Sequence, residues 1–195
     1  MQLIEKVKGF LGDPSKEFNL NRDEAPEEAV KYYLIIAGIY SLLSAIVFAL
    51  IYTMVSPLVN NYGLLTQPYG ITEIFSNFFM SFILMLIGVF IWGTILYIFA
   101  FALGGRKGFI KTIRAAMYAT TPLALIGWIP LLGAIGWIWV CALDIIGLHV
   151  YQDISPGRAI AAVIISSLLL FVTVLVVLIV IITTIVPMVL EGISV

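Results

Sequence analysis

The sequence predicts an all-α integral membrane protein: a five-transmembrane-helix bundle with a short amphipathic N-terminal helix, its N-terminus inside and its C-terminus outside. Three observations lead to this fold class. The composition is 62% hydrophobic and only 11% charged, whereas soluble domains average about 45–50% apolar and about 25% charged residues. Five long apolar runs are separated by four loops. All ten Lys and Arg residues fall on one predicted side of the membrane.

The positions of the cations set the predicted orientation. Cationic segments are hard to translocate, so loops that carry Lys and Arg stay in the cytoplasm. The cations precede the first apolar run, lie between the second and third, or lie between the fourth and fifth: Lys6, Lys8, Lys16, Arg22, Lys31, Arg106, Lys107, Lys111, Arg114 and Arg158. We therefore expect residues 1–31 to form a cytoplasmic head and residues 32–195 to form a five-span membrane domain.

The head is expected to begin with a short amphipathic helix over residues 1–11. Apolar side chains recur at helical spacing on one face: Leu3, Ile4, Val7, Phe10 and Leu11. Charged side chains lie on the other face: Glu5, Lys6 and Lys8. Such a helix beside a membrane favours lying in the interface, so Leu3, Val7 and Phe10 are expected to face lipid. An equal alternative is that the same face packs against the protein's own cytoplasmic loops.

A break and a further helix start follow within the head. Gly12-Asp13-Pro14 ends the first helix, and Asp13 before Pro14 is expected to cap another turn that contains Phe18. Acidic residues then surround Pro26: Asp23, Glu24, Glu27 and Glu28. Acids and a proline in a first turn favour a helix N-terminus and its dipole, so this helix is expected to run directly into the first span.

Five spans are expected at about 32–55, 75–103, 113–129, 132–150 and 159–190. A membrane-crossing helix needs about 20 residues, so the third span is short and the fifth is long. The fifth must therefore tilt or project from the bilayer. Small residues recur four apart on the first and fifth spans: Ala37, Ser41 and Ala45, and Ala162 and Ser166. Such stripes let helix backbones approach closely and predict a compact bundle.

The third and fourth spans are expected to form a tight antiparallel hairpin. The connecting loop between Gly127 and Gly133 is almost wholly apolar, and the two glycines permit a sharp reversal. We expect the hairpin to be packed centrally through Ala115, Ala119 and Gly136 rather than to lie at the periphery. Aromatic residues near the loop indicate a belt at the outer interface: Trp128, Trp137 and Trp139.

Asp144 is the one acidic residue inside a predicted span. An ionisable group there costs about 2.5–3.5 kcal/mol on insertion scales, so it needs a partner or a function. Arg114 opens the third span at the inner surface and is the favoured ion-pair partner, with Arg158 second. The alternative makes Asp144 a proton or cation site. We favour the structural ion pair, because transport pathways usually show several intramembrane polar groups and this chain shows one.

The residue types that an enzyme or a metal centre requires are sparse. The single histidine, His149, and the single cysteine, Cys141, form no pair at metal-ligand spacing. Without paired catalytic groups or a basic, aromatic-rich stripe, we expect no enzyme, no cofactor, no metal and no nucleic-acid partner. Polar residues of the cytoplasmic turns are expected to face anionic lipid headgroups or a partner: Arg106, Lys107, Lys111 and His149.

A set of short motifs across the second half of the chain resembles a known family. The motifs are Gly104-Gly105, Phe109 to Arg114, Tyr118-Ala119-Thr120-Thr121-Pro122, Trp128-Ile129-Pro130-Leu131-Leu132-Gly133, Asp144-Ile145-Ile146-Gly147-Leu148-His149 and Ile154-Ser155-Pro156-Gly157-Arg158-Ala159. In their spacing the chain resembles the Yip domain family, five-span membrane proteins named for interacting with Ypt/Rab small GTPases. The Asp13-Pro14 pattern followed by Phe18 is similar to the short head of prokaryotic-type members. The resemblance implies the five-span fold, an inside N-terminus and no reaction.

These observations predict a non-enzymatic integral membrane protein that organises membrane or recruits partners through its cytoplasmic face. A role in vesicle-mediated transport is implied by the resemblance alone. The alternative is a small transporter or channel that uses Asp144. The expected partners are the lipid bilayer, including anionic lipids, and a membrane or cytoplasmic protein. A small GTPase is expected as a partner only by analogy with the family, and self-association into a homo-oligomer is a further alternative. The expected location is the plasma membrane, as a multi-pass protein, or an endomembrane if the source is eukaryotic.

Overall fold

The computed structural model describes residues 3–60 and 70–193 of the 195-residue chain. These residues form helices joined by short turns: α1 (Leu3–Gly12), α2 (Pro14–Leu20), α3 (Pro26–Asn60), α4 (Ile71–Ala102), α5 (Phe109–Ala119), the π-helix η1 (Leu123–Gly127), α6 (Leu132–Gln152) and α7 (Pro156–Ile193). Four of the described helices, α3, α4, α6 and α7, are long and apolar enough to cross a membrane. The all-helical membrane fold class predicted from composition is therefore confirmed.

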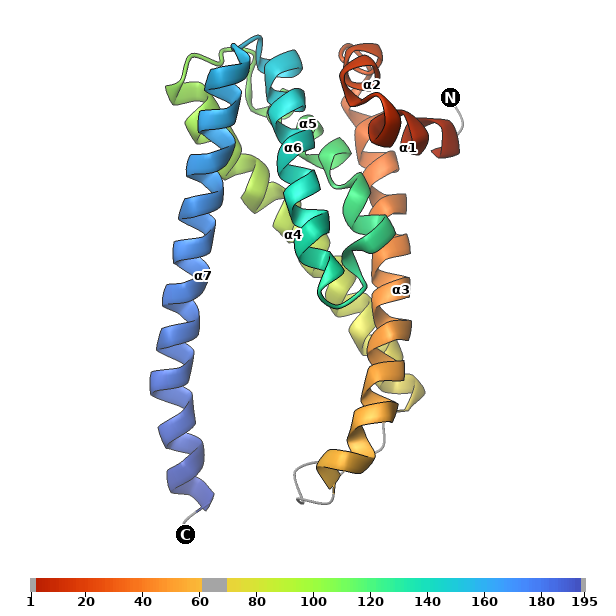
Figure 1. The fold of residues 1–195 in the computed structure, drawn as a ribbon, viewed down its shortest axis with the longest axis vertical. Helices are drawn as coiled ribbons and strands as arrows, with labels where there is room; N and C mark the ends of the chain where they lie inside the picture. The colour runs from red at the N-terminus through yellow and green to blue at the C-terminus, as the bar shows by residue number, and fades with distance from the viewer. Residues whose placement is uncertain (1–2, 61–69, 194–195) are drawn as a thin grey trace.

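The head and two polar turns lie at one end of the bundle, here called the head end. α1, α2, the turn after α4 and the turn between α6 and α7 all lie at this end (Figure 1). The C-terminus and the last turns of α3 lie at the opposite end. α3 packs on α4 and α5, and α7 packs on α4 and α6, so the α5–η1–α6 hairpin lies between α3 and α7.

The third predicted span is not one continuous α-helix. Between α5 and η1, the hydroxyls of Thr120 and Thr121 donate hydrogen bonds to the carbonyls three residues earlier, at 2.7 and 2.6 Å. Pro122 follows and has no N–H to donate to the helical ladder. Side-chain bonds of this kind compete with the backbone ladder, and the next turn widens into a π-helix. The single helix predicted over residues 113–129 is thus divided into two pieces.

The hairpin between η1 and α6 reverses at a leucine rather than at a glycine. Leu131 has a φ of 70°, in the left-handed region, whereas the two loop glycines predicted the reversal at Gly127 and Gly133. Gly133 instead allows its backbone to approach the backbone of Gly127, because a Cβ at position 133 would meet the Gly127 carbonyl oxygen at 3.1 Å. A leucine in this conformation costs roughly 1–2 kcal/mol, and the packing of the hairpin on either side must offset that strain.

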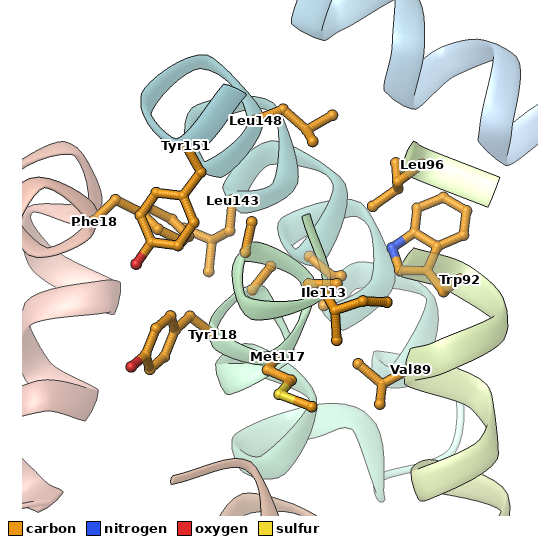
Figure 2. Packing of buried hydrophobic residues seen from close by; sticks show 14 of the residues in the cluster. Phe18, Val89, Trp92, Leu96, Ile113, Met117, Tyr118, Leu143, Leu148 and Tyr151 are labelled. Carbon is orange, nitrogen blue, oxygen red and sulfur yellow. The ribbon is translucent and has the colours of Figure 1, made fainter. Parts of the chain in front are cut away.

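The α5–η1–α6 hairpin occupies the centre of the bundle, as predicted. Ala115 and Ala119 on α5 are fully buried, and Gly136 on α6 lies against η1. In Figure 2, Ile113 and Met117 of α5 lie close to side chains of α4. The small-residue stripes on α3 and α7 are also buried, which confirms their predicted role in packing: Ala37, Ser41, Ala45, Ala162 and Ser166.

α7 is the longest described helix and packs along only part of its length. Its 38 residues extend roughly 57 Å at about 1.5 Å per residue, whereas the hydrocarbon core of a bilayer is about 30 Å thick. The side chains of residues 171–184 are all exposed, and this part of α7 runs away from the bundle (Figure 1). The excess length predicted for the last apolar run is therefore confirmed.

Candidate functional site

The two short helices of the head pack tightly against each other. Asp13 accepts a hydrogen bond from the Lys16 backbone N–H at 3.1 Å, and Pro14 opens α2, so the predicted helix cap is confirmed. Gly9 permits the close contact between α1 and α2, because a Cβ there would meet a Glu17 carboxylate oxygen at 2.2 Å. The head is therefore a folded helical pair.

Phe10 and Phe18 anchor the head in the bundle. Both side chains are fully buried. Phe10 stacks on the Tyr118 ring with centroids 4.9 Å apart, and Phe18 meets the Tyr151 ring edge-on at 5.6 Å (Figure 2). A Cβ at Gly147 would approach the Phe18 ring to 3.1 Å, so this glycine makes room for the ring. Phe10 thus packs against the protein itself, the second of the two alternatives left open for the first helix.

The two faces of α1 differ from the prediction at two positions. Ile4, assigned to the apolar face, is 64% exposed, and Lys6, assigned to the polar face, is buried. The Lys6 Nζ lies 2.7 Å from the Glu24 carboxylate and 5.0 Å from the centre of the Tyr118 ring. The ion pair and the aromatic face together compensate for removing the ammonium group from water. Two other residues of the predicted interfacial face pack at the edge of the core: Leu3 and Val7.

Glu24 joins the head to α5. Lys6 and Tyr118 each donate a hydrogen bond to the same carboxylate oxygen at 2.7 Å. Partial burial acts to raise the pKa of Glu24, but these two hydrogen bonds, with the charges of Lys6 and Arg114, bring that pKa below its ordinary value. Glu24 is therefore charged at neutral pH and holds both donors.

Arg114 faces the head rather than the membrane interior. Its guanidinium donates to the Asn21 backbone carbonyl at 2.7 Å, and the Tyr151 hydroxyl donates to the same carbonyl at 3.1 Å. Asn21 follows α2, where unpaired carbonyls and the negative end of the helix dipole favour a cation. Arg114 also lies over the Tyr151 ring at 5.3 Å. These contacts at the end of α2 direct the guanidinium away from Asp144.

The turn after α4 is tied to the end of α6 by a buried glutamine. Gly104 and Gly108 have φ values of 105° and 95°, a region that glycine enters without steric cost. Gln152 donates to the Gly108 carbonyl at 2.8 Å and accepts from the Lys107 backbone N–H at 3.0 Å. The glutamine amide therefore satisfies backbone groups on a turn more than forty residues away.

Asp153 connects the head, the turn after α4 and the end of α6. Lys107 and Arg22 lie 2.9 and 2.6 Å from its carboxylate. The hydrogen bond from Lys107, with a further one from Arg22, lowers the pKa of Asp153 below its ordinary value. A hollow of about 460 Å³ lies beside this cluster, lined mainly by polar side chains: Ser15, Asn19, Arg22, His149, Asp153 and Ser155.

The other residues predicted to face lipid or a partner lie at the same end. His149 is exposed, lines the hollow, and its Nδ1 lies 2.6 Å from the Ile154 carbonyl oxygen. Arg106 is exposed but folds back, with its guanidinium 4.1 Å from the centre of the Phe101 ring. Lys111 is half-buried and 3.9 Å from an acidic side chain of the head. With Lys107 bound to Asp153, each of the four predicted residues therefore makes an intramolecular contact.

Asp144 is fully buried in α6 and binds a tryptophan rather than an arginine. The Trp92 indole N–H donates to one carboxyl oxygen at 2.7 Å. The other oxygen has no hydrogen-bond partner among residues 3–60 and 70–193. The predicted ion pair is wrong, because Arg114 binds the head and the Arg158 guanidinium lies beside Gly104.

Trp137 likewise differs from the prediction of an outer aromatic belt. It is half-buried, and its ring meets the Trp92 ring edge-on with centroids 5.0 Å apart. Trp92 lies well inside a long apolar helix, away from the membrane interface where tryptophan acts as an anchor. Its position in the sequence could therefore have indicated that it packs inside the bundle.

Nothing in the local sequence pattern singled out Gln152, because a polar residue at a helix end is ordinarily solvated.

One family matches most of this chain. The Yip1 domain matches residues 8–189, from within α1 to within α7. The matched region includes the motifs between Gly104 and Ala159 that carried the resemblance, which is therefore confirmed. Comparisons with curated proteins and with solved structures gave no match.

Proposed function

This chain belongs to the Yip1 domain family, and from that membership and the head end we propose a non-enzymatic integral membrane protein that recruits a partner on its cytoplasmic face and organises membrane. One observation carries the proposal. The folded head, the turn after α4 and the end of α6 form one surface, joined through Asp153 by Arg22 and Lys107. Three segments distant in sequence thereby present a single face.

The proposal includes the topology of the chain. We take α5 and η1 together as a third crossing, so that the chain crosses five times with its N-terminus inside and its C-terminus outside. The cations lie in the head, in the turn after α4 and near the head-end starts of α3, α5 and α7, and cationic segments stay in the cytoplasm. An odd number of crossings puts the two termini on opposite sides, in agreement with their positions at opposite ends of the bundle (Figure 1).

The proposed partner is a cytoplasmic or membrane protein that contacts the hollow beside Asp153. Anionic lipid headgroups are proposed for the exposed cations of the same end, since Lys and Arg near a membrane surface attract them. Because of the family resemblance, small GTPases are the first class of partner to test, and vesicle-mediated transport is the first cellular process to test. The proposed membrane is the plasma membrane, or an endomembrane in a eukaryotic cell.

Photo-crosslinking in native membranes tests recruitment. A photoreactive residue in place of His149, which is exposed in the hollow, should trap a discrete protein. The same residue in place of Ile138, which is 69% exposed on the apolar part of α6, should trap only lipid. Ser15→Trp should suppress the protein adduct at position 149 by filling the hollow. Lipid adducts alone at position 149 would defeat the proposal.

A second candidate is a small transporter or channel with Asp144 as a proton or cation site. The observation that favours it is the buried carboxyl oxygen that no described group binds. Proteoliposomes with a pH gradient test it, comparing wild type with Asp144→Asn. Proton flux in wild type that falls with Asp144→Asn would support transport. Flux no greater than in protein-free liposomes would remove this candidate.

A further inference from the structure

A cavity of about 420 Å³ lies inside the apolar part of the bundle. Its walls come from α3, α4, η1, α6 and α7, and four aromatic side chains line it: Tyr33, Tyr40, Trp92 and Trp137. The lining residues on α3, α4, α6 and α7 belong to the helices that are long and apolar enough to cross a membrane. The cavity therefore lies at bilayer depth, apart from the hollow at the head end.

The cavity wall is largely apolar, and several of its polar groups are engaged within the protein. The Tyr33 hydroxyl donates to a backbone carbonyl of α4 at 2.5 Å, and the Trp92 indole N–H donates to Asp144 at 2.7 Å. The Thr120 hydroxyl donates to a carbonyl of α5 at 2.7 Å. A buried water needs about two to four polar partners. Because most of the lining is apolar, the cavity is suited to an apolar occupant rather than to ordered water.

The cavity opens sideways through the wall of α4. Leu84, Gly88 and Ile91 follow one another at helical spacing, and all three line it. Leu84 is 59% exposed and Ile91 is 52% exposed, on a surface that faces lipid in a membrane protein. Gly88, between them, has no side chain to close the wall. A hydrocarbon chain in the bilayer can therefore reach the cavity without crossing polar surface.

Gly88 has no role in close packing. A Cβ at Gly88 would meet no heavy atom within 4 Å, whereas a Cβ at Gly93 on the same helix would meet the Ile113 side chain at 2.6 Å. A glycine inside a helix lowers its stability relative to alanine. At Gly93 the close approach of α5 explains the glycine. At Gly88 no neighbour requires a glycine, and the missing side chain leaves open space beside α4.

We infer that this cavity binds one hydrocarbon chain of a bilayer phospholipid, which enters beside Gly88 and lies against the rings of Trp92 and Trp137. The lateral opening, the bilayer depth and the largely apolar wall point to this occupant. Flat aromatic faces supply dispersion contacts along a linear chain and require no hydrogen bonds from it. The inference does not depend on recruitment at the cytoplasmic face.

Native mass spectrometry of protein released from phosphatidylcholine nanodiscs tests the inference. Wild type should retain one phospholipid after the surrounding lipid is stripped. Gly88→Leu should lose it, because the leucine side chain fills the cavity. Gly38→Leu is the matched control: an added Cβ there also meets nothing within 4 Å, but Gly38 does not line the cavity. Wild type without a retained phospholipid, or Gly88→Leu that retains it equally, would overturn the inference.

Tryptophan fluorescence locates the bound chain. With Trp128→Phe and Trp139→Phe, the remaining tryptophans are Trp92 and Trp137, which both line the cavity. In nanodiscs whose phospholipid is brominated along one chain, their emission should be quenched, and adding Gly88→Leu should remove at least half of that quenching. Equal quenching with and without the leucine would mean that the chains lie only around the bundle.

A second variant keeps the test decisive if Gly88→Leu fails to fold. Leu84→Phe enlarges an exposed side chain at the mouth of the cavity, so it should lower phospholipid retention without disturbing the core. Circular dichroism and gel filtration check that each variant is folded. Full retention in folded Leu84→Phe, together with unchanged quenching, would count against entry beside Gly88.

Discussion

The indole nitrogen of Trp92 lies 2.7 Å from a carboxyl oxygen of Asp144 and links α4 to α6 inside the bundle. Because the donor is neutral, the contact is a hydrogen bond and not the ion pair that an intramembrane carboxyl predicts. In the described part of the chain the second carboxyl oxygen has no hydrogen-bond partner. The contribution of Asp144 to stability can therefore be separated from that of its donor.

Asp144→Asn should leave the protein nearly as stable as wild type. The new amide oxygen still accepts from Trp92, and no ion pair is lost, so the free energy of unfolding should change by less than about 1 kcal/mol. Trp92→Phe should cost about 1–3 kcal/mol, because the buried carboxyl then has no donor. Unfolding in detergent measures both, with Trp139→Phe at an exposed position as control. A larger loss for Asp144→Asn than for Trp92→Phe would contradict this assignment.

Phe10→Asp should release the head without unfolding the long helices. The Phe10 ring is fully buried between Phe18 and Tyr118, and removing a buried phenylalanine side chain costs about 3–5 kcal/mol. Hydrogen–deuterium exchange of residues 3–24 should rise sharply while α4 keeps its protection. Ile4→Asp, at an exposed position of the same helix, should change little. Lost protection in α4 as well would mean that the bundle needs the head to fold.

Acidification should weaken docking of the head. The pKa of Glu24 is lowered from its ordinary 4.5, so the stabilisation by its carboxylate is fully present above pH 4.5 and is lost as pH falls through the lower folded-state pKa. The pKa of Asp153 is also lowered, from 3.8, and acts in the same direction. Hydrogen exchange of residues 3–24, corrected for intrinsic rates, should increase between pH 5 and pH 3. Glu24→Gln should flatten this dependence, and tighter docking at low pH would contradict it.

Ala119→Leu should destabilise the protein. Ala119 is fully buried in α5, and inserting extra methylenes into a packed core costs about 1–3 kcal/mol. The same substitution at Ala142, which is exposed on α6, should be nearly neutral. Thermal unfolding in detergent compares the two variants. Equal stability of both would place α5 at the edge of the bundle rather than at its centre.

Impermeant thiol labelling in intact cells should report the proposed topology. In a Cys141→Ser background, a cysteine at Gln67, which lies outside the described residues, and one at Gly192, near the end of α7, should react from outside. Ser155→Cys, in the exposed turn before α7, should react only after the cells are opened. Labelling of position 155 from outside would reverse the proposed orientation.

Local patterns in the sequence predicted much of the fold. The long apolar runs, the Asp13 cap and the buried stripe at Ala37, Ser41 and Ala45 depend on residues close together in sequence, so composition and spacing reveal them. The break between α5 and η1 was missed because apolar length alone sets a predicted span. Two threonine hydroxyls bound to nearby carbonyls, followed by Pro122, interrupt the helix at that point.

The contacts of the candidate site depended on packing between distant segments. Arg114 was expected to pair with Asp144 because it is cationic and close in predicted depth, but the carbonyl at the end of α2 competes for it. Lys6 was placed on a solvated face because charged residues usually lie there. Its buried position requires both Glu24 and Tyr118, and no periodicity within the first helix reveals either residue.

The docking of the head has a consequence for the order of events during biosynthesis. The head emerges first from the ribosome, yet the Tyr151 hydroxyl that binds the Asn21 carbonyl is synthesised 130 residues later. Phe10 lacks the Tyr118 ring until α5 has been made, and Phe18 lacks the Tyr151 ring throughout the interval. Closing so long a loop also carries an entropic cost. The nascent protein must therefore insert several helices with an undocked, aggregation-prone N-terminal segment. The head can dock completely only after α6 has been made.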